Sequence, residues 1–142
     1  MDWQNISCAI VGGILTIQSL WDMKYREILI SVSVIGIMGG VFGVILTKRD
    51  LIKLLLAFVP AGISLIFSKL SRGALGLGDV IVLVMMAFYY SLERIISICI
   101  LAFSIAAVIA LYLLIVVHKR GDYQIPFVPF LWMGWLIDML LV

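Results

Sequence analysis

Charged side chains are scarce in this sequence. Its 142 residues include only ten basic and eight acidic side chains, whereas 65% of the residues are hydrophobic. Soluble domains are roughly half apolar and about a quarter charged. This composition excludes an ordinary soluble domain and leaves no segment polar enough to form a separate one. We therefore expect one polytopic domain over residues 1–142, embedded almost entirely in a membrane.

Metal-ligating side chains are also scarce. The chain has two cysteines, Cys8 and Cys99, and one histidine, His118. A structural zinc site needs four cysteine or histidine ligands, so we expect no metal and no other cofactor. The cysteines are expected to be small apolar residues within helices rather than a disulfide. His118 is expected to lie at a membrane edge beside Lys119 and Arg120.

A strong net charge is absent as well. The formal net charge is +2, and no basic patch is interleaved with aromatic residues. These features exclude nucleic acid as a partner. The first apolar stretch has no basic region before it and no small-residue cleavage site after it, which favours a retained helix over a removed signal peptide.

Long uncharged runs are what the sequence does have. They predict an all-α integral membrane protein with about six transmembrane helices. Pro60 lies inside the third run and predicts a kink, because proline removes one helix hydrogen bond. The expected spans are Trp3–Trp21, Ile28–Thr47, Leu51–Ser68, Val80–Leu92 (or Gly73–Leu92 if the glycine-rich stretch joins the helix), Ile95–Val117 and Tyr123–Val142.

The alternation of six spans assigns each polar loop to one side of the membrane. Six lysines and arginines fall on the side of the first loop and four on the other, so the positive-inside rule places the first loop in the cytoplasm. Asp22 ends the first expected span and Asp79 begins the fourth. Both acids therefore fall on the same side, whichever side is cytoplasmic.

The two acids suggest a reaction. A carboxylate at the edge of a bilayer is costly and by default marks a functional site. If two carboxyl groups lie together, one keeps its proton, because the like charges raise one pKa. The ionised acid can take a proton from water, and the protonated acid can polarise a peptide carbonyl. Gly76 and Gly78 would let the backbone turn beside Asp79 and leave room for an extended substrate.

Each acid alone has a simpler interpretation. Asp22, close to Lys24 and Arg26, suits a solvated loop. Asp79 suits the N-cap of a helix that begins at Val80. Their matched topology and the glycine turn favour a functional pair.

The remaining acids lack a motif. Asp138 has no partner that the sequence reveals. Glu27 and Asp122 fall on the side of the pair and are expected to form ion pairs with nearby basic residues. Three more look like surface groups on the other side: Asp2, Asp50 and Glu93.

Three segments of the chain form a set. They are Gly76-Leu77-Gly78-Asp79, the stretch Asp22–Ile28, and Ile125-Pro126-Phe127-Val128-Pro129-Phe130. The first is similar to the G-x-G-D motif of membrane aspartic proteases. The second resembles the first-aspartate region of type IV prepilin peptidases, and the third resembles the segment that opens their final helix. G-x-G-D alone is a weak pattern, but the three segments in this order are specific.

The resemblance implies a function. Members of this family remove the short basic leader from type IV prepilin-like precursors at the cytoplasmic face of the bacterial cell membrane. They cut after a glycine just before the hydrophobic helix of the precursor. By resemblance, Asp22 and Asp79 form the catalytic dyad of an aspartic endopeptidase, and Gly76 and Gly78 shape the loop.

The resemblance also suggests secondary roles and partners. Pro126 and Pro129 would help to build the wall of the site, and Lys24 and Arg26 would set the local potential or touch lipid headgroups. The expected partners are prepilin-like precursors and the lipid bilayer, and the oligomeric state stays open.

Two departures from the family pattern are present. Ile28 is followed by Leu29-Ile30, where many members have Pro-Asn, so the shape of this loop is in question. The chain also lacks the paired C-x-x-C insert that accompanies methylation, which predicts a form with peptidase activity only.

Two other classes of protein are alternatives to the peptidase. A small proton-coupled transporter would use acids near the middle of the membrane and show repeat symmetry, and the sequence has neither. A non-catalytic membrane scaffold would tolerate Asp79→Asn, whereas a peptidase would not.

Overall fold

The computed structural model describes residues 3–70, 76–116 and 126–141. Over these ranges the chain is helical and contains no strand, which confirms the all-α prediction. Each expected span contains a helix, and the third is divided in two. The helices are α1 (Trp3–Tyr25), α2 (Ile30–Thr47), α3 (Leu51–Ala57), α4 (Val59–Leu70), α5 (Leu77–Tyr89), α6 (Leu92–Ile115) and α7 (Val128–Leu141).

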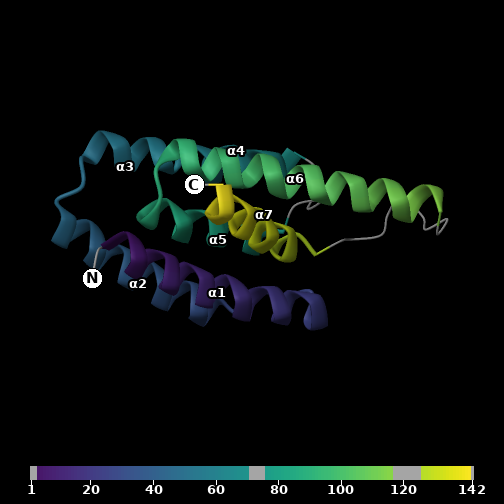
Figure 1. Cartoon of the computed structure of the whole chain (residues 1–142), viewed down its shortest axis with the longest axis horizontal. Helices are drawn as coiled ribbons and strands as arrows, with labels where there is room; N and C mark the ends of the chain where they lie inside the picture. The colour runs from purple at the N-terminus through teal and green to yellow at the C-terminus, as the bar shows by residue number, and fades with distance from the viewer. Residues whose placement is uncertain (1–2, 71–75, 117–125, 142) are drawn as a thin grey trace.

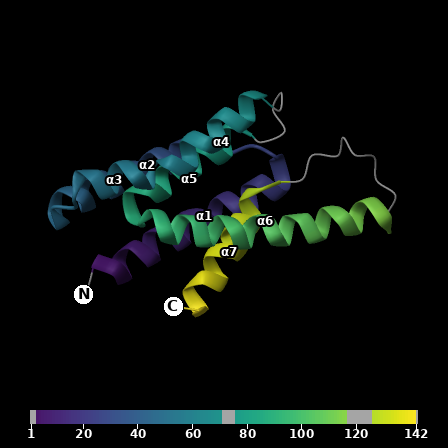
Figure 2. The same cartoon turned by 90° about the horizontal axis from the view of Figure 1, so that it is seen from above.

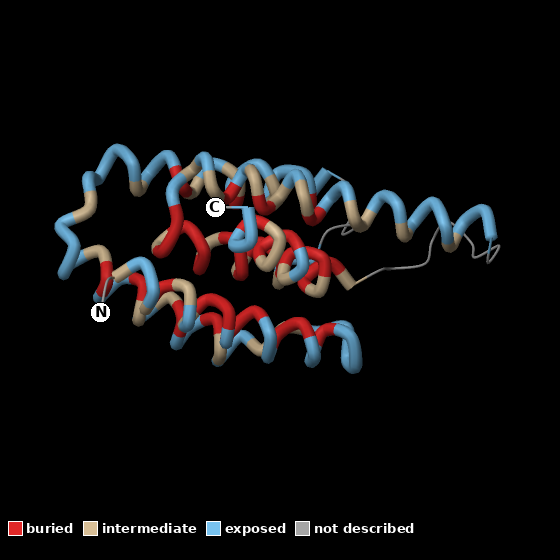
Figure 3. Tube along the Cα trace, in the orientation of Figure 1, coloured by how far each residue is buried: buried red, intermediate tan, exposed pale blue. Residues whose placement is uncertain are grey.

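Four of these stretches are long and apolar enough to cross a membrane. They are α1, α2, α6 and the combined stretch Leu51–Leu70 of α3 and α4. The other two helices, α5 and α7, are apolar but have only 13 and 14 residues. Exposed residues line the outer faces of the long stretches (Figure 3). Many of the exposed residues are large and apolar, among them Ile35 and Phe42 of α2 and Ile63 of α4. Such surfaces suit contact with lipid, so the protein is an all-α membrane protein.

The third expected span is interrupted near Pro60, where the sequence predicts a kink. Phe58 separates α3 from α4, two residues before the proline. The Phe58 N–H donates to Leu55 O at 3.2 Å, which closes a tighter turn than an α-helix. Proline causes the break because its ring clashes with the carbonyl one turn earlier and it has no N–H to donate.

The two short helices occupy the centre of the bundle. In Figure 1, α5 and α7 lie between α1 with α2 on one side and α3, α4 and α6 on the other. α7 packs against α6 and α1, and α5 packs against α2 and α4. The fully buried side chains of the core include Met85 and Met86 of α5, Ile98 of α6 and Leu131 of α7. α5 and α7 are therefore more enclosed by protein than the four longer stretches around them.

A stripe of small residues brings α2 against α5. The buried residues of α2 are all small: Ser33, Gly36, Gly40 and Gly43. A Cβ atom on Gly36 would lie 2.6 Å from Met85 Sδ, and the Tyr89 hydroxyl donates to Gly36 O at 2.6 Å. Small residues let two helix backbones approach closely inside a membrane. This contact fixes α5 beside α2.

Several expected helix boundaries are wrong by a few residues. α1 continues four residues past Trp21, so Asp22 lies in its last turn rather than in the following loop. α5 begins at Leu77, between the two expected starts, Gly73 and Val80, and α6 begins at Leu92 instead of Ile95. The last helix begins at Val128. The glycine-rich residues 73–75, and residues 123–125 of the last expected span, lie outside the described residues.

Candidate active site

The last turn of α1 positions Asp22. The helix ends where Arg26 adopts a left-handed backbone with φ 55°, and the Arg26 N–H donates to Asp22 O at 2.9 Å. The Asp22 side chain points inward, and the residue is only 6% exposed. Its Oδ2 accepts a hydrogen bond from the Val128 N–H at 3.3 Å. The start of α7 therefore contacts the first acid directly.

The first turn of α5 positions Asp79. The simpler interpretation of Asp79, as the N-cap of a helix beginning at Val80, does not hold, because Gly76 is the N-cap and Asp79 is the third helical residue. The Asp79 carboxylate accepts from the Gly76 N–H at 3.1 Å, and the Asp79 N–H donates to Gly76 O at 3.1 Å. A carboxylate in the first turn is stabilised by the unpaired N–H groups and the helix dipole.

The structure brings the two acids together. The end of α1 and the starts of α5 and α7 lie at the same end of the bundle (Figures 1 and 2). Asp79 is 7% exposed, and it lies near enough to Asp22 for the two carboxylate charges to repel each other. Such repulsion is strong in a poorly solvated site. Two buried carboxyl groups in this position favour a state in which one of them holds a proton.

The two glycines of the G-x-G-D segment lie where a side chain would disturb this pair. A Cβ atom on Gly78 would lie 2.5 Å from Ile28 Cδ1 and 2.8 Å from Ile28 Cγ1. The segment that follows α1 therefore packs directly on the first turn of α5. A Cβ atom on Gly76 would lie 3.3 Å from Asp79 Oδ2, tighter than an ordinary contact. Glycine at both positions lets the two acid-bearing segments meet.

The contact between Gly78 and Ile28 gives a testable prediction. If the two acids carry out the peptide cleavage that the sequence resemblance implies, Gly78→Ala should displace Ile28 and the first turn of α5 and slow that reaction, because overpacking of a closed site typically costs about 1–3 kcal/mol. Ile28→Ala removes the two closest atoms, so the double variant should regain much of the lost rate. The measurement is the initial rate of that cleavage for the two single variants and the double variant. Independent, additive losses would show that this contact does not position Asp79.

The start of α7 contacts the pair of acids through a backbone N–H group and not through its prolines. Pro126 and Pro129 are both half-buried. Pro129 is the second residue of α7, where the backbone N–H of any residue would have no partner within the helix, so proline costs no hydrogen bond there. Phe127 and Val128 are buried. The polar contact to the pair comes from the Val128 N–H to Asp22.

The basic residues that follow Asp22 stay on the surface. Lys24 is exposed, and its Nζ lies 5.0 Å from the centre of the Tyr25 ring. Arg26 and Glu27 are exposed as well. The other acid expected on this side, Asp122, lies outside the described residues, as do His118, Lys119 and Arg120.

Gln18 was missed by the sequence analysis. It lies one turn before Asp22 on α1, is 0% exposed, and donates from Nε2 to Ser33 Oγ of α2 at 2.6 Å. Its Oε1 has no hydrogen-bond partner among the described residues. A glutamine within an apolar run, four residues from an acid on the same helix face, is the signal that could have identified it.

Asp138 is the clearest correction to the expectations for the remaining acids. Arg94 Nε donates to Asp138 Oδ2 at 2.8 Å, which joins α6 to α7. Cys8 and Cys99 are free thiols within α1 and α6, as expected. Among the described residues, no three histidine, cysteine or acidic side chains gather into a group that could hold a metal ion.

Comparison with known proteins completes the description of the site. The sequence pattern of the type IV leader peptidase family matches residues 9–111, more than half of the chain. This range includes both acids and the glycine turn but ends before the Ile125–Phe130 segment. Searches of curated proteins and of solved structures find no match. The chain belongs to the type IV leader peptidase family.

Proposed function

We propose that this chain is an aspartic endopeptidase that removes the basic leader from type IV prepilin-like precursors, with Asp22 and Asp79 as its catalytic dyad. Membership of the leader peptidase family gives the general activity. The observation that supports the finer proposal is the position of two buried carboxyl groups at one end of the bundle, on α1 and α5, near enough for their charges to interact.

The proposed reaction uses both protonation states of the pair. The ionised carboxylate takes a proton from a water molecule, and the water oxygen bonds to the carbon of the scissile carbonyl. The protonated acid donates a hydrogen bond to the carbonyl oxygen and stabilises the charge that develops there. When the tetrahedral intermediate collapses, the C–N bond breaks and the amine leaves with a proton from the dyad. No covalent intermediate is needed.

We propose that an extended substrate approaches the dyad beside Gly76, which places no side chain there. Gly78 serves close packing instead, because the Ile28 side chain fills the space beside it. We propose that Pro126 and Pro129, which precede and open α7, form part of the wall. Lys24 and Arg26 are exposed beside the site and would repel a basic leader, since their charges have the same sign. We therefore propose that they set the local electrostatic potential or contact lipid headgroups.

The proposed location is the cell membrane of a bacterium, with the dyad facing the cytoplasm and one domain spanning residues 1–142. The support is the excess of lysine and arginine on the side of the dyad, six against four over the whole sequence. Three of the six, at positions 72, 119 and 120, lie outside the described residues.

The test is cleavage of a defined precursor panel. The protein would be co-expressed in bacterial membranes with prepilin-like precursors that carry a short basic leader and a Gly-Phe junction. We expect a shorter product on gels, with phenylalanine as its new N-terminal residue by mass spectrometry. A matched precursor with a bulky residue in place of the junction glycine should stay intact. If no precursor of the panel is cut, the substrate class is wrong.

A further inference from the structure

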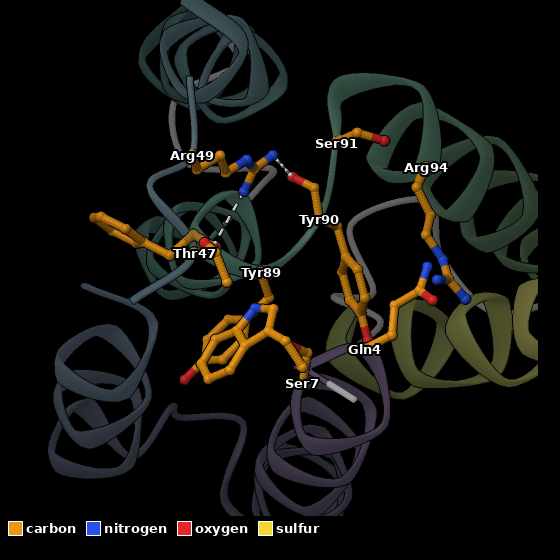
Figure 4. Close-up of a pocket in the computed structure, with 10 residues that line it drawn as sticks. Gln4, Ser7, Thr47, Arg49, Tyr89, Tyr90, Ser91 and Arg94 are labelled. Carbon is orange, nitrogen blue, oxygen red and sulfur yellow. Dashed lines mark hydrogen bonds between the residues drawn. The ribbon is translucent and has the colours of Figure 1, made fainter. Parts of the chain in front are cut away.

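A cavity of about 290 Å³ lies at the end of the bundle opposite the two acids. It forms where the start of α1, the end of α2, the end of α5 and the start of α6 meet (Figure 4). Its polar lining consists of Gln4, Ser7, Thr47, Arg49, Ser91 and Arg94. None of these residues belongs to the proposed peptidase site, so the cavity calls for a separate explanation.

The cavity carries an excess of positive charge. Arg49 Nη1 donates to Ala87 O at 3.1 Å and to Phe88 O at 3.2 Å, and its Nη2 donates to Tyr90 O at 2.5 Å, which caps the end of α5. Arg94 Nε pairs with Asp138, and its Nη2 donates to Met139 Sδ at 3.3 Å. A guanidinium group has five N–H donors, so both arginines retain donors beyond these contacts. One carboxylate opposes two guanidinium groups, which leaves a net positive charge at the cavity.

Two serines of the lining, Ser7 and Ser91, lack the side-chain hydrogen bond that their positions normally provide. Ser91 is the N-cap of α6, yet its side chain makes no capping hydrogen bond, so the positive end of this helix remains available. Ser7 is only 3% exposed, and its Oγ has no hydrogen-bond partner among the described residues. A buried polar atom of this kind requires a partner. Glu93, in the same first turn of α6, is exposed and is not part of the lining.

We propose that this cavity binds a phosphate group, supplied by the headgroup of an anionic phospholipid in the leaflet opposite the acids. Phosphate oxygens accept strong hydrogen bonds from guanidinium groups and from N–H groups at a helix N-terminus. The cavity lies at helix ends, beside the ring of Trp3 at the start of α1, a residue type typical of the membrane interface. The lipid source is inferred from this position, because the ends of helices that cross a bilayer lie near the headgroup phosphates.

The test introduces one negative charge into the cavity without disturbing the helix. Asp and Asn are both favoured N-caps, so Ser91→Asp and Ser91→Asn should both fold. The full-length protein in detergent micelles would be titrated with dioleoyl phosphatidylglycerol and, separately, with inorganic phosphate, and binding followed by thermal unfolding and native mass spectrometry. We expect Ser91→Asp to bind the lipid at least about tenfold more weakly, through charge repulsion. Ser91→Asn should bind it like the wild type.

The outcomes separate the sources of the phosphate. Lipid binding that millimolar inorganic phosphate does not displace supports the headgroup. Inorganic phosphate that binds alone and shows the same loss in Ser91→Asp supports a phosphate site but overturns the lipid source. Absence of binding by both probes, or equal binding by the two variants, overturns the proposal. If Ser91→Asp fails to fold, Gln4→Glu adds the same charge at nearly constant shape and should give the same loss.

Discussion

Asp79→Asn should abolish leader cleavage and leave the fold intact. Asparagine has nearly the same shape as aspartate, and its side-chain oxygen can still accept the Gly76 N–H, so the first turn of α5 should form normally. It cannot exchange a proton with water or with Asp22, so the loss should be roughly 10²–10⁴-fold or more, the range of general acid–base catalysis. The measurement is the single-turnover cleavage rate, with the thermal unfolding midpoint followed in parallel.

The matched control lies at the other end of the molecule. Asp50 is also an acid at a helix start, and its Oδ1 accepts the Ile52 N–H at 3.1 Å. Asp50→Asn repeats the chemical change without touching the pair, so its cleavage rate should equal that of the wild type. Asp22→Asn should be as inactive as Asp79→Asn, because both acids act in one step. Cleavage that survives in one of the two would remove that residue from the dyad.

Arg94→Met should destabilise the protein more than any other single change discussed above. Asp138 is buried, and Arg94 supplies the one ion pair seen for it among the described residues. Removal of one partner leaves a buried carboxylate uncompensated, which typically costs about 3–5 kcal/mol. The arginine also covers the Tyr90 ring at 4.9 Å, so some packing is lost as well. The measurement is the free energy of unfolding in mixed micelles.

A second substitution should restore most of this loss. In Arg94→Met/Asp138→Leu no charge remains to be buried, and well-packed apolar replacements of an ion pair are often neutral. Asp138→Leu alone should be less harmful than Arg94→Met alone, because the arginine is the more exposed partner and can reach water. A loss below about 1 kcal/mol for Arg94→Met would mean that the pair behaves like a surface ion pair.

The sequence predicted the six apolar segments well, because length and lack of charge are strong signals in a membrane protein. The helix ends were predicted less well, and α5 shows why. Two glycines before Asp79 favour a loop, yet the Asp79 carboxylate binds the Gly76 N–H and moves the helix start to Leu77. This local hydrogen bond outweighs the low helix propensity of Gly78.

For the candidate site, the sequence identified the two acids but not the contacts that position their side chains. Alternating spans and the G-x-G-D segment were enough to place Asp22 and Asp79 at one end of the bundle. The Val128 N–H that contacts Asp22 lies 106 residues away, and the contact exists only because α7 packs against α1. The partner of Asp138 was missed for the same reason, since it depends on the packing of α6 against α7.

The brevity of α5 bears on where the scissile bond must go. Thirteen residues rise about 20 Å along a helix, whereas the hydrocarbon layer is about 30 Å thick. The longer helices around α5 can span that layer, whereas α5 falls about 10 Å short of it unless the bilayer is locally thinner. With Asp79 in the first turn of so short a helix, hydrolysis would take place below the headgroups. The helix of the precursor would then have to unwind where it leaves the hydrocarbon layer. Only a peptide bond at that level could be reached by both the dyad and the attacking water.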